Sequence, residues 1–180
     1  MPQRPRPPLP YDFLPRVPPL TVTSADISDG GRMPDAHLAD SMGMKGGNLS
    51  PQLGWSGIPD GTESFAVTCY DPDAPTGSGF WHWVLFDIPS SVHELPRAAG
   101  SGQMDGLPAE AKHSRNDAGY HGYTGAAPPP GDGDHRYVFA VHALGIPTLE
   151  LDETASPAYV GFNLTFNTLA RGLLTVEYGR

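Results

Sequence analysis

The sequence predicts a mainly β protein, a Greek-key antiparallel β-sandwich with few short helices, one of them near the C-terminus. Three segments, 64–70, 82–88 and 136–144, alternate apolar and polar residues with the period of two that is typical of strands. Helical patterns do not alternate with these strands, which argues against a doubly wound fold. The chain has 180 residues and is 38% hydrophobic, so its Gly 22 and Pro 21 indicate turns between short strands rather than disorder.

Residues 1–19 are predicted to form an extended arm that wraps around the domain or frays at its end. This segment contains eight prolines and few apolar anchors beyond Tyr11, Phe13 and Leu14. Residues 20–180 are long enough to bury a core, and we expect them to form one β-sandwich domain.

The first two strands are expected at 20–24 and 52–55, on either side of a Gly-rich loop. This loop lacks the Gly-Lys-Ser/Thr sequence of a nucleotide-binding phosphate loop. In the stronger strands that follow, alternate residues share one face. These residues, expected in the core, are Phe65, Val67, Cys69, Tyr137, Phe139, Val141 and Ala143.

A helix is predicted to begin at Ser156-Pro157, where a hydroxyl cap precedes a proline in the first helical position. Apolar residues then recur at spacings of 3, 4 and 3, and we expect them to pack on the sandwich. They are Tyr159, Phe162, Phe166 and Leu169. Gly172 is expected to end the helix, and 173–178 to form the last strand.

The charge and the targeting signals limit the classes of function. With 11 basic and 20 acidic side chains, the formal charge of -9 repels nucleic acid and anionic bilayers but allows a local anion site. A lone cysteine, Cys69, excludes an internal disulfide, and we expect it in the core. The sequence has no signal-peptide pattern or membrane-spanning stretch, which predicts a cytoplasmic protein.

The run Asp71-Pro72-Asp73-Ala74-Pro75 is the strongest candidate for a functional site. Each residue before a proline is held extended, so the carboxylates project from a stiffened loop. Asp71 ends one strand and His82 begins the next, so an antiparallel pairing brings both to the same end of the sheet. His135 and Tyr137, which begin a third strand after the Pro-rich segment 125–133, are candidates for the same end.

Four ordered motifs resemble those of phosphatidylethanolamine-binding proteins over residues 20–179. They are Asp71-Pro-Asp-Ala-Pro75, Phe80-Trp-His-Trp-Val84, Pro128-Pro-Pro-Gly131 and His135-Arg-Tyr-Val-Phe139. Residues 48–55 and Asn116-Asp117 also resemble the bacterial branch, which is often called the Raf kinase inhibitor-like proteins.

The resemblance implies a small pocket at one end of the sandwich for phosphate, acetate or a phosphorylated head group. The pocket residues carried over are Asp71, Pro75, His82, Gly125, Pro128, His135 and Tyr137. The resemblance also implies a cis bond between Ala74 and Pro75, an isomer that proline makes accessible. Both histidines and the tyrosine would donate to the anion. Asp71 would accept from an imidazole, with His82 the favoured partner, or from an amine of the ligand.

Two departures from the family pattern affect this pocket. Related proteins often have Gly-Pro-x-Pro-Pro where this chain has Gly125-Ala126-Ala127-Pro128-Pro129, which predicts a less rigid rim. Asp134 adds a negative charge beside His135 and would raise the pKa of that histidine if it pointed inward. Trp55, Trp81 and Trp83 are expected in the core and the pocket wall.

The favoured function is therefore a non-catalytic binding protein for a small anion or phosphorylated ligand. The resemblance implies a kinase or a protease as a possible protein partner, and a homodimer. The alternative is a metal-dependent or acid-base hydrolase that uses Asp71, His82 and His135. No nucleophile or metal motif accompanies these three residues, so we predict no enzyme activity, metal or cofactor.

Overall fold

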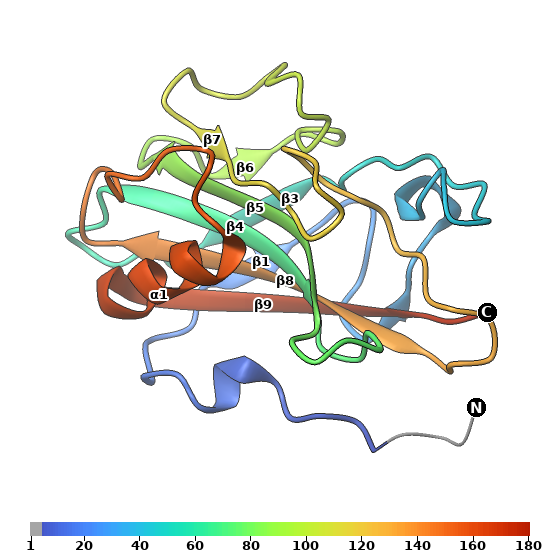
Figure 1. The fold of residues 1–180 in the computed structure, drawn as a ribbon. Helices are drawn as coiled ribbons and strands as arrows, with labels where there is room; N and C mark the ends of the chain where they lie inside the picture. Colours follow the sequence, from blue (N-terminus) through green and yellow to red (C-terminus); the bar gives the residue numbers. More distant parts are fainter. Residues whose placement is uncertain (1–4) are drawn as a thin grey trace.

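The computed structural model describes residues 5–180 as two β-sheets packed face to face (Figure 1). The smaller sheet has the order β1 (Thr21–Thr23), β3 (Leu53–Ser56) and β6 (Glu94–Leu95). The larger has the order β2 (Gly31–Arg32), β9 (Thr168–Tyr178), β8 (His135–Leu144), β4 (Ser64–Asp71), β5 (Phe80–Pro89) and β7 (Lys112–His113). The predicted β-sandwich is confirmed, and all pairings are antiparallel except that β2 runs parallel to β9.

The three strongly alternating segments form the centre of the larger sheet as predicted. Their alternate side chains from β4 and β8 are buried between the sheets, and Cys69 is a free thiol within this core. The structure adds β2, β6 and β7, which the sequence did not predict. Each has two residues, which is too short for a periodic pattern to appear.

The helix α1 (Pro157–Asn167) begins at the predicted cap, where Ser156 Oγ accepts from the backbone N–H of Tyr159 at 3.2 Å. Its predicted end at Gly172 is wrong, because the chain enters β9 at Thr168 and pairs with β8 along almost its whole length. Gly172 lies inside β9. A Cβ there would lie 2.5 Å from Val22 Cγ2, so this glycine permits the close approach of β1 to β9.

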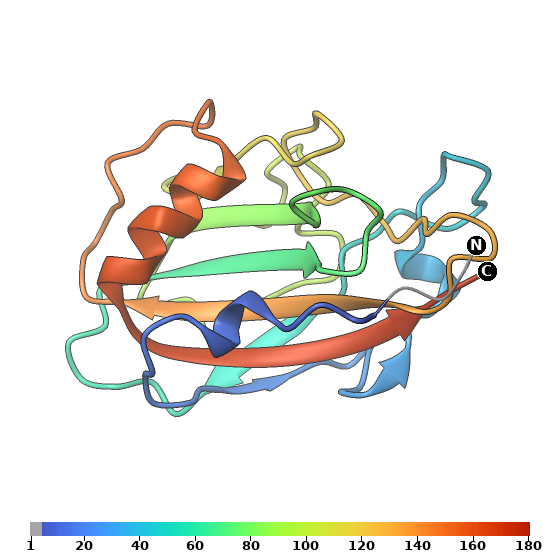
Figure 2. The ribbon, with the colours of Figure 1, turned by 60° about the horizontal axis from the view of Figure 1, so that its bottom comes forward.

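The face of α1 that packs on the sheet also differs from the prediction. Val160 and Leu164 are buried against the outer face of the larger sheet, on which the helix lies (Figure 2). The predicted stripe is instead exposed, with Tyr159 at 54%, Phe162 at 58% and Phe166 at 71%. The smaller aliphatic side chains let the helix approach the sheet closely. On its outer side, Phe162 stacks on Tyr159 and lies edge-on to Phe166.

Residues 5–19 run as an extended arm over the outer face of the larger sheet, alongside β9 (Figure 2). Tyr11 anchors the arm: its ring lies beside His142 and under the guanidinium of Arg171, and its hydroxyl is 3.5 Å from Thr68 Oγ1. Residues 1–4 of the predicted arm lie outside the described residues. Within residues 5–180, no helix is long and apolar enough to cross a membrane.

Candidate anion-binding site

A cavity of about 230 Å³ lies at the end of the sandwich where β4 ends and β5 and β8 begin. The antiparallel register places Asp71 opposite Phe80, so His82 is two residues along the neighbouring strand. The structure brings six of the seven predicted residues around this cavity. They are Asp71, Pro75, His82, Pro128, His135 and Tyr137. We refer to this space as the anion cavity.

Gly125, the seventh predicted residue, supports the rim rather than lining the cavity. Its N–H donates to Asn48 Oδ1 at 2.8 Å, and a Cβ there would lie 2.4 Å from the backbone of Leu38 and Ala39. The glycine is required for packing at this position. Next to it, the N–H of Ala126 donates to the carbonyl of His37 at 3.3 Å, a bond that a proline at 126 could not make.

Several wall residues were not singled out by the sequence analysis. They are Met42, Ala74, Thr76, Phe80, Ala127 and Pro129. Phe80 could have been found, because it lies two residues before His82 and so shares its face of β5. The expectation that Trp55, Trp81 and Trp83 contribute to the pocket wall as well as to the core is wrong, because none of them lines the cavity. Trp81 packs on Tyr70, with a ring separation of 4.5 Å, while Trp55 and Trp83 lie in the core.

His135 lies between two carboxylates. Its Nδ1 is 2.7 Å from Asp71 Oδ2, and its Nε2 is 3.2 Å from Asp132 Oδ2. Burial disfavours the imidazolium, but the hydrogen bonds and charges of the two carboxylates outweigh burial and raise the pKa of His135. With both ring nitrogens donating to carboxylates, His135 is not the anion donor that the sequence analysis expected.

The expected contact between Asp71 and His82 is not formed, because each of these residues has another partner. His82 Nδ1 donates to the carbonyl of Thr124 at 2.7 Å, which fixes the ring and leaves Nε2 for a ligand. Burial lowers the pKa of His82 despite the charge of Asp71, so the ring is neutral at pH 7. Asp71 Oδ1 accepts from the N–H of Asp73 at 2.8 Å, so both oxygens of Asp71 have partners within the protein.

Tyr137 supplies a buried donor that has no partner. Its hydroxyl forms no hydrogen bond within residues 5–180, although it is fully enclosed. Burial raises the pKa of Tyr137, so the phenol keeps its proton. The ring lies edge-on to His82, with centroids 5.1 Å apart. An unsatisfied buried hydroxyl costs about 1–3 kcal/mol, so this group does not stabilise the free protein and is a candidate donor to a ligand.

Two further expectations about the rim are corrected. The bond between Ala74 and Pro75 is trans; proline allows both isomers, and here the N–H of Thr76 donates to the carbonyl of Ala74 at 2.7 Å. Asp134 does not point at the cavity but faces solvent, with one oxygen 3.7 Å from Arg32. Asp132, two residues earlier, takes the place beside the imidazole.

The proposed alternative of a metal-dependent hydrolase has no matching cluster in the described part of the chain. Among residues 5–180, no group of three or more His, Cys, Asp or Glu side chains is placed to hold a metal ion. Asp71 and His135 bond to each other, whereas His82 is turned toward Thr124.

The comparisons with known proteins agree with this fold. The sequence profile of the family described as "Phosphatidylethanolamine-binding protein" matches residues 23–179. UPF0098 protein YbhB of Escherichia coli K12 is 48% identical over 159 residues, which is 88% of this chain and 99% of that protein. UPF0098 protein YbcL of the same organism is 48% identical over 157 residues, or 87% of this chain and 86% of that protein.

Two solved structures are similar over nearly the whole chain. The crystal structure of E. coli YbcL, described as a new member of the mammalian PEBP family, has a TM-score of 0.87 and 46% identity. It covers 89% of this chain and 98% of YbcL. CT736 of Chlamydia trachomatis, described as a homolog of the same family, has a TM-score of 0.74 and 25% identity, and covers 90% of this chain and 98% of CT736.

Proposed function

The chain belongs to the phosphatidylethanolamine-binding protein family, and from this premise we propose that its anion cavity binds phosphate or a small phosphorylated group without catalysis. The observation that carries the proposal is the hydroxyl of Tyr137, a buried donor with no partner in the described structure, in a cavity that His82 also lines. A ligand oxygen that accepts from Tyr137 would satisfy this group.

The bound ligand would meet Tyr137 and His82 rather than His135. A phosphate oxygen accepts from the phenol, and a protonated phosphate oxygen donates to the neutral Nε2 of His82. His135 and Asp71 form the charged floor behind them, with His135 offsetting part of the negative charge of Asp71 and Asp132. The apolar walls exclude water and strengthen these few polar contacts.

The test is calorimetric titration of the full chain with inorganic phosphate and with phosphoethanolamine. We expect both to bind, and we expect Tyr137→Phe to abolish or strongly weaken the binding of both. Tyr123→Phe is the matched control, because the hydroxyl of this buried tyrosine donates to the carbonyl of His37 at 2.8 Å, and Tyr123 does not line the cavity. Equal affinities in the wild type and Tyr137→Phe would refute the proposal.

The absence of catalysis is part of the same proposal. The acid-base alternative assigns proton transfer to Asp71, His82 and His135, but both nitrogens of His135 and both oxygens of Asp71 already have partners within the protein. Of these three residues, His82 alone keeps a ring nitrogen for a substrate, so it has no acid-base partner at the cavity. Hydrolysis of a phosphomonoester panel at a rate that Asp71→Asn abolishes would favour the alternative.

Action on a protein partner, a kinase or a protease, stays a prediction from the family resemblance. A cytoplasmic location stays a prediction from the targeting patterns of the sequence. We also propose a homodimer, and the exposed aromatic face of α1 supports it. This face consists of Tyr159, Phe162 and Phe166, and α1 has no charged residue. Two copies of such a face are self-complementary about a two-fold axis.

A further inference from the structure

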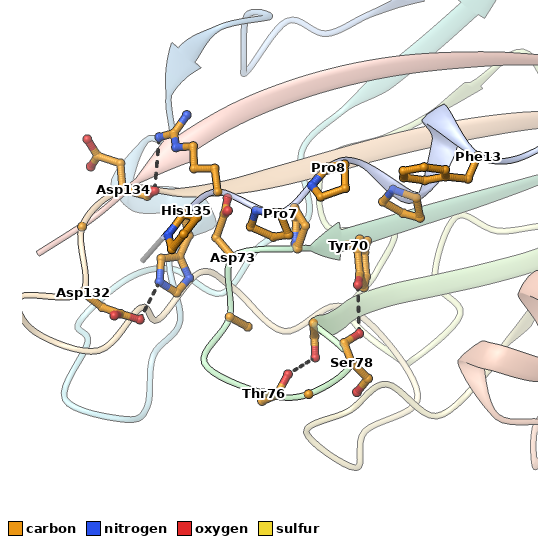
Figure 3. Close-up of a pocket in the computed structure, with 18 residues that line it drawn as sticks. Pro7, Pro8, Phe13, Tyr70, Asp73, Thr76, Ser78, Asp132, Asp134 and His135 are labelled. Carbon is orange, nitrogen blue, oxygen red and sulfur yellow. Dashed lines mark hydrogen bonds and ion pairs between the residues drawn. The ribbon is translucent and has the colours of Figure 1, made fainter. Parts of the chain in front are cut away.

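A second hollow of about 840 Å³ lies beside the anion cavity, on the outer face of the larger sheet. One of its walls is the arm from Pro5 to Phe13, and the other is the loop after β4, residues 72–79, with Tyr70 at its base (Figure 3). We refer to this space as the arm groove. Its volume falls in the range of about 300–1,000 Å³ that is typical of small-molecule sites.

The arm groove adjoins the anion cavity. Ala74, Thr76 and His135 line both spaces, so the two hollows meet along the loop after β4 and at the start of β8. A ligand with its anionic group beside Tyr137 could therefore extend past Thr76 into the arm groove.

The arm contributes an apolar wall. Its lining residues are the proline rings of Pro5, Pro7, Pro8 and Pro10, together with Arg6 and Phe13. A proline has no N–H, so this wall cannot pair with a peptide backbone in the manner of an added strand. The opposite wall presents the ring of Tyr70, Pro72 and two glycines, together with the polar side chains of Asp73, Thr76 and Ser78. Such a surface favours an aliphatic or aromatic substituent over a peptide main chain.

The charged groups at the edge of the groove are paired with one another. Two guanidinium nitrogens of Arg136 each donate to a carboxylate oxygen of Asp73 at 2.8 Å. Arg6 Nη1 donates to Glu177 Oε1 at 2.7 Å. The third pair is Arg32 with Asp134. Because these charges are neutralised within the protein, the groove offers no strong field to a second ionic group on the ligand.

The same ion pairs fix the position of the arm. Arg136 Nη2 donates to the carbonyl of Pro7 at 2.7 Å, and Arg6 Nη2 donates to the carbonyl of Asp134 at 3.3 Å. The arm is thus tied to the start of β8 through Arg136 and to the loop before it through Asp134. Figure 3 shows Pro7 of the arm and Asp134 of this loop on either side of His135. The family match begins at residue 23, so this wall lies outside the matched domain.

We propose that the arm is a specificity element, which makes the site select phosphate monoesters bearing an extended apolar substituent over inorganic phosphate. This inference rests on the proposed function of the anion cavity. The anionic group occupies the cavity beside Tyr137, and the substituent lies in the arm groove between the prolines and Tyr70.

The test measures the affinity of the full chain for inorganic phosphate and for monohexyl phosphate by calorimetry. The wild type is expected to bind the hexyl ester at least about tenfold more tightly, because each buried methylene adds to affinity. Gly77→Leu should abolish this preference and leave the affinity for phosphate unchanged. Gly77 lines the groove, and a Cβ there meets no atom within 4 Å, so the position has room for a side chain to begin. Gly77→Ala is the graded control.

A second pair of variants tests the arm itself. The double variant Arg6→Ala/Tyr11→Ala removes two anchors of the arm. We expect it to bind inorganic phosphate and monohexyl phosphate with nearly equal affinity. Arg16→Ala is the matched control, an exposed arm residue that does not line the groove.

The outcomes separate the two proposals. Equal wild-type affinities for phosphate and hexyl phosphate would overturn the role of the arm and leave the anion cavity intact. A preference that persists in Gly77→Leu and in the anchor variant would also overturn it. Failure of the wild type to bind either compound would overturn the proposed function itself.

Discussion

His135 donates from Nδ1 to Asp71 across 2.7 Å, which joins two residues 64 positions apart in the chain. Asp71 is the last residue of β4 and His135 the first of β8, and these strands are direct neighbours in the larger sheet. The contact ties the Asp-Pro-Asp-Ala-Pro loop to the sheet at the floor of the anion cavity. It holds the imidazole between Asp71 and Asp132, where the charge of the protonated ring offsets part of the negative charge of the two carboxylates.

Asp71→Asn should therefore lower both the pKa of His135 and the stability at acidic pH. The raised pKa means that this bond stabilises the fold fully below the ordinary imidazole value of about 6.5, and that this stabilisation is lost as the pH rises through the raised value. We expect a loss of about 2 kcal/mol at pH 6, as for a hydrogen bond between charged groups. Urea unfolding and NMR titration of the ring measure the two effects. Asp134→Asn is the control, since that carboxylate faces Arg32 and solvent.

Tyr137→Phe should weaken phosphate binding and yet stabilise the free protein. Removing a buried hydroxyl that has no partner relieves a cost of about 1 kcal/mol, and the retained ring keeps the packing. Thermal unfolding without ligand gives the stability and calorimetry gives the affinity. Tyr123→Phe should do the reverse, with lower stability and unchanged affinity, because its hydroxyl has a partner. A Tyr137→Phe protein that is less stable than the wild type would show that the hydroxyl has a structural role.

Sulfate binding should strengthen as the pH falls from 7.5 to 5.5. Burial lowers the pKa of His82, so the ring is neutral near pH 7, and an anion beside Nε2 favours its protonation. Sulfate does not titrate in this range, so a pH dependence of its affinity reports on the protein. Calorimetry in buffers with different ionisation enthalpies counts the protons taken up. An affinity that is independent of pH in the wild type would exclude His82 as the group that responds.

His142 should make the fold sensitive to acid. It is buried on the outer face of the sheet beside Tyr11 and Thr168, and burial, together with the charge of Arg171, lowers its pKa to about 3. The unfolded chain takes up a proton near the ordinary value while the folded chain does not, so stability falls as the pH drops from about 6.5 toward 3. In urea titrations, His142→Gln should flatten this dependence. His93→Gln, at an exposed position, should leave it unchanged.

Phe162→Ser should convert a dimer into a monomer. The ring is at the centre of the exposed aromatic face of α1, stacked on Tyr159 and edge-on to Phe166, and its loss would interrupt a self-complementary contact. Light scattering gives the mass of each protein. Phe13→Ser changes an exposed ring on the arm and should leave the mass unchanged. A wild-type protein that is monomeric at high concentration would refute the proposed interface.

The fold and the residues of the site follow largely from two features of the sequence, the alternation of apolar and polar residues and the order of the motifs. The alternation in β4 and β8 predicts both the strands and their buried faces, because a period of two leaves one face for the core. The ordered motifs around Asp71, His82 and His135 predict that these residues gather at one end, because antiparallel neighbours bring the end of one strand to the start of the next. The short strands β2, β6 and β7 have no such pattern and exist only through their partners.

The contacts within the site depend on the packed chain. The sequence places two histidines, His82 and His135, at the same end of the sheet as Asp71, and it does not determine which of them Asp71 contacts. His135 receives its carboxylate because Thr124, from a distant loop, already accepts the N–H of His82. The buried face of α1 was settled in the same way. The spacing predicted that the stripe of rings packs on the sheet, but Val160 and Leu164, with smaller side chains, are the residues that pack on its outer face. A sequence states which groups are available, whereas burial and competition among partners in three dimensions determine which groups meet.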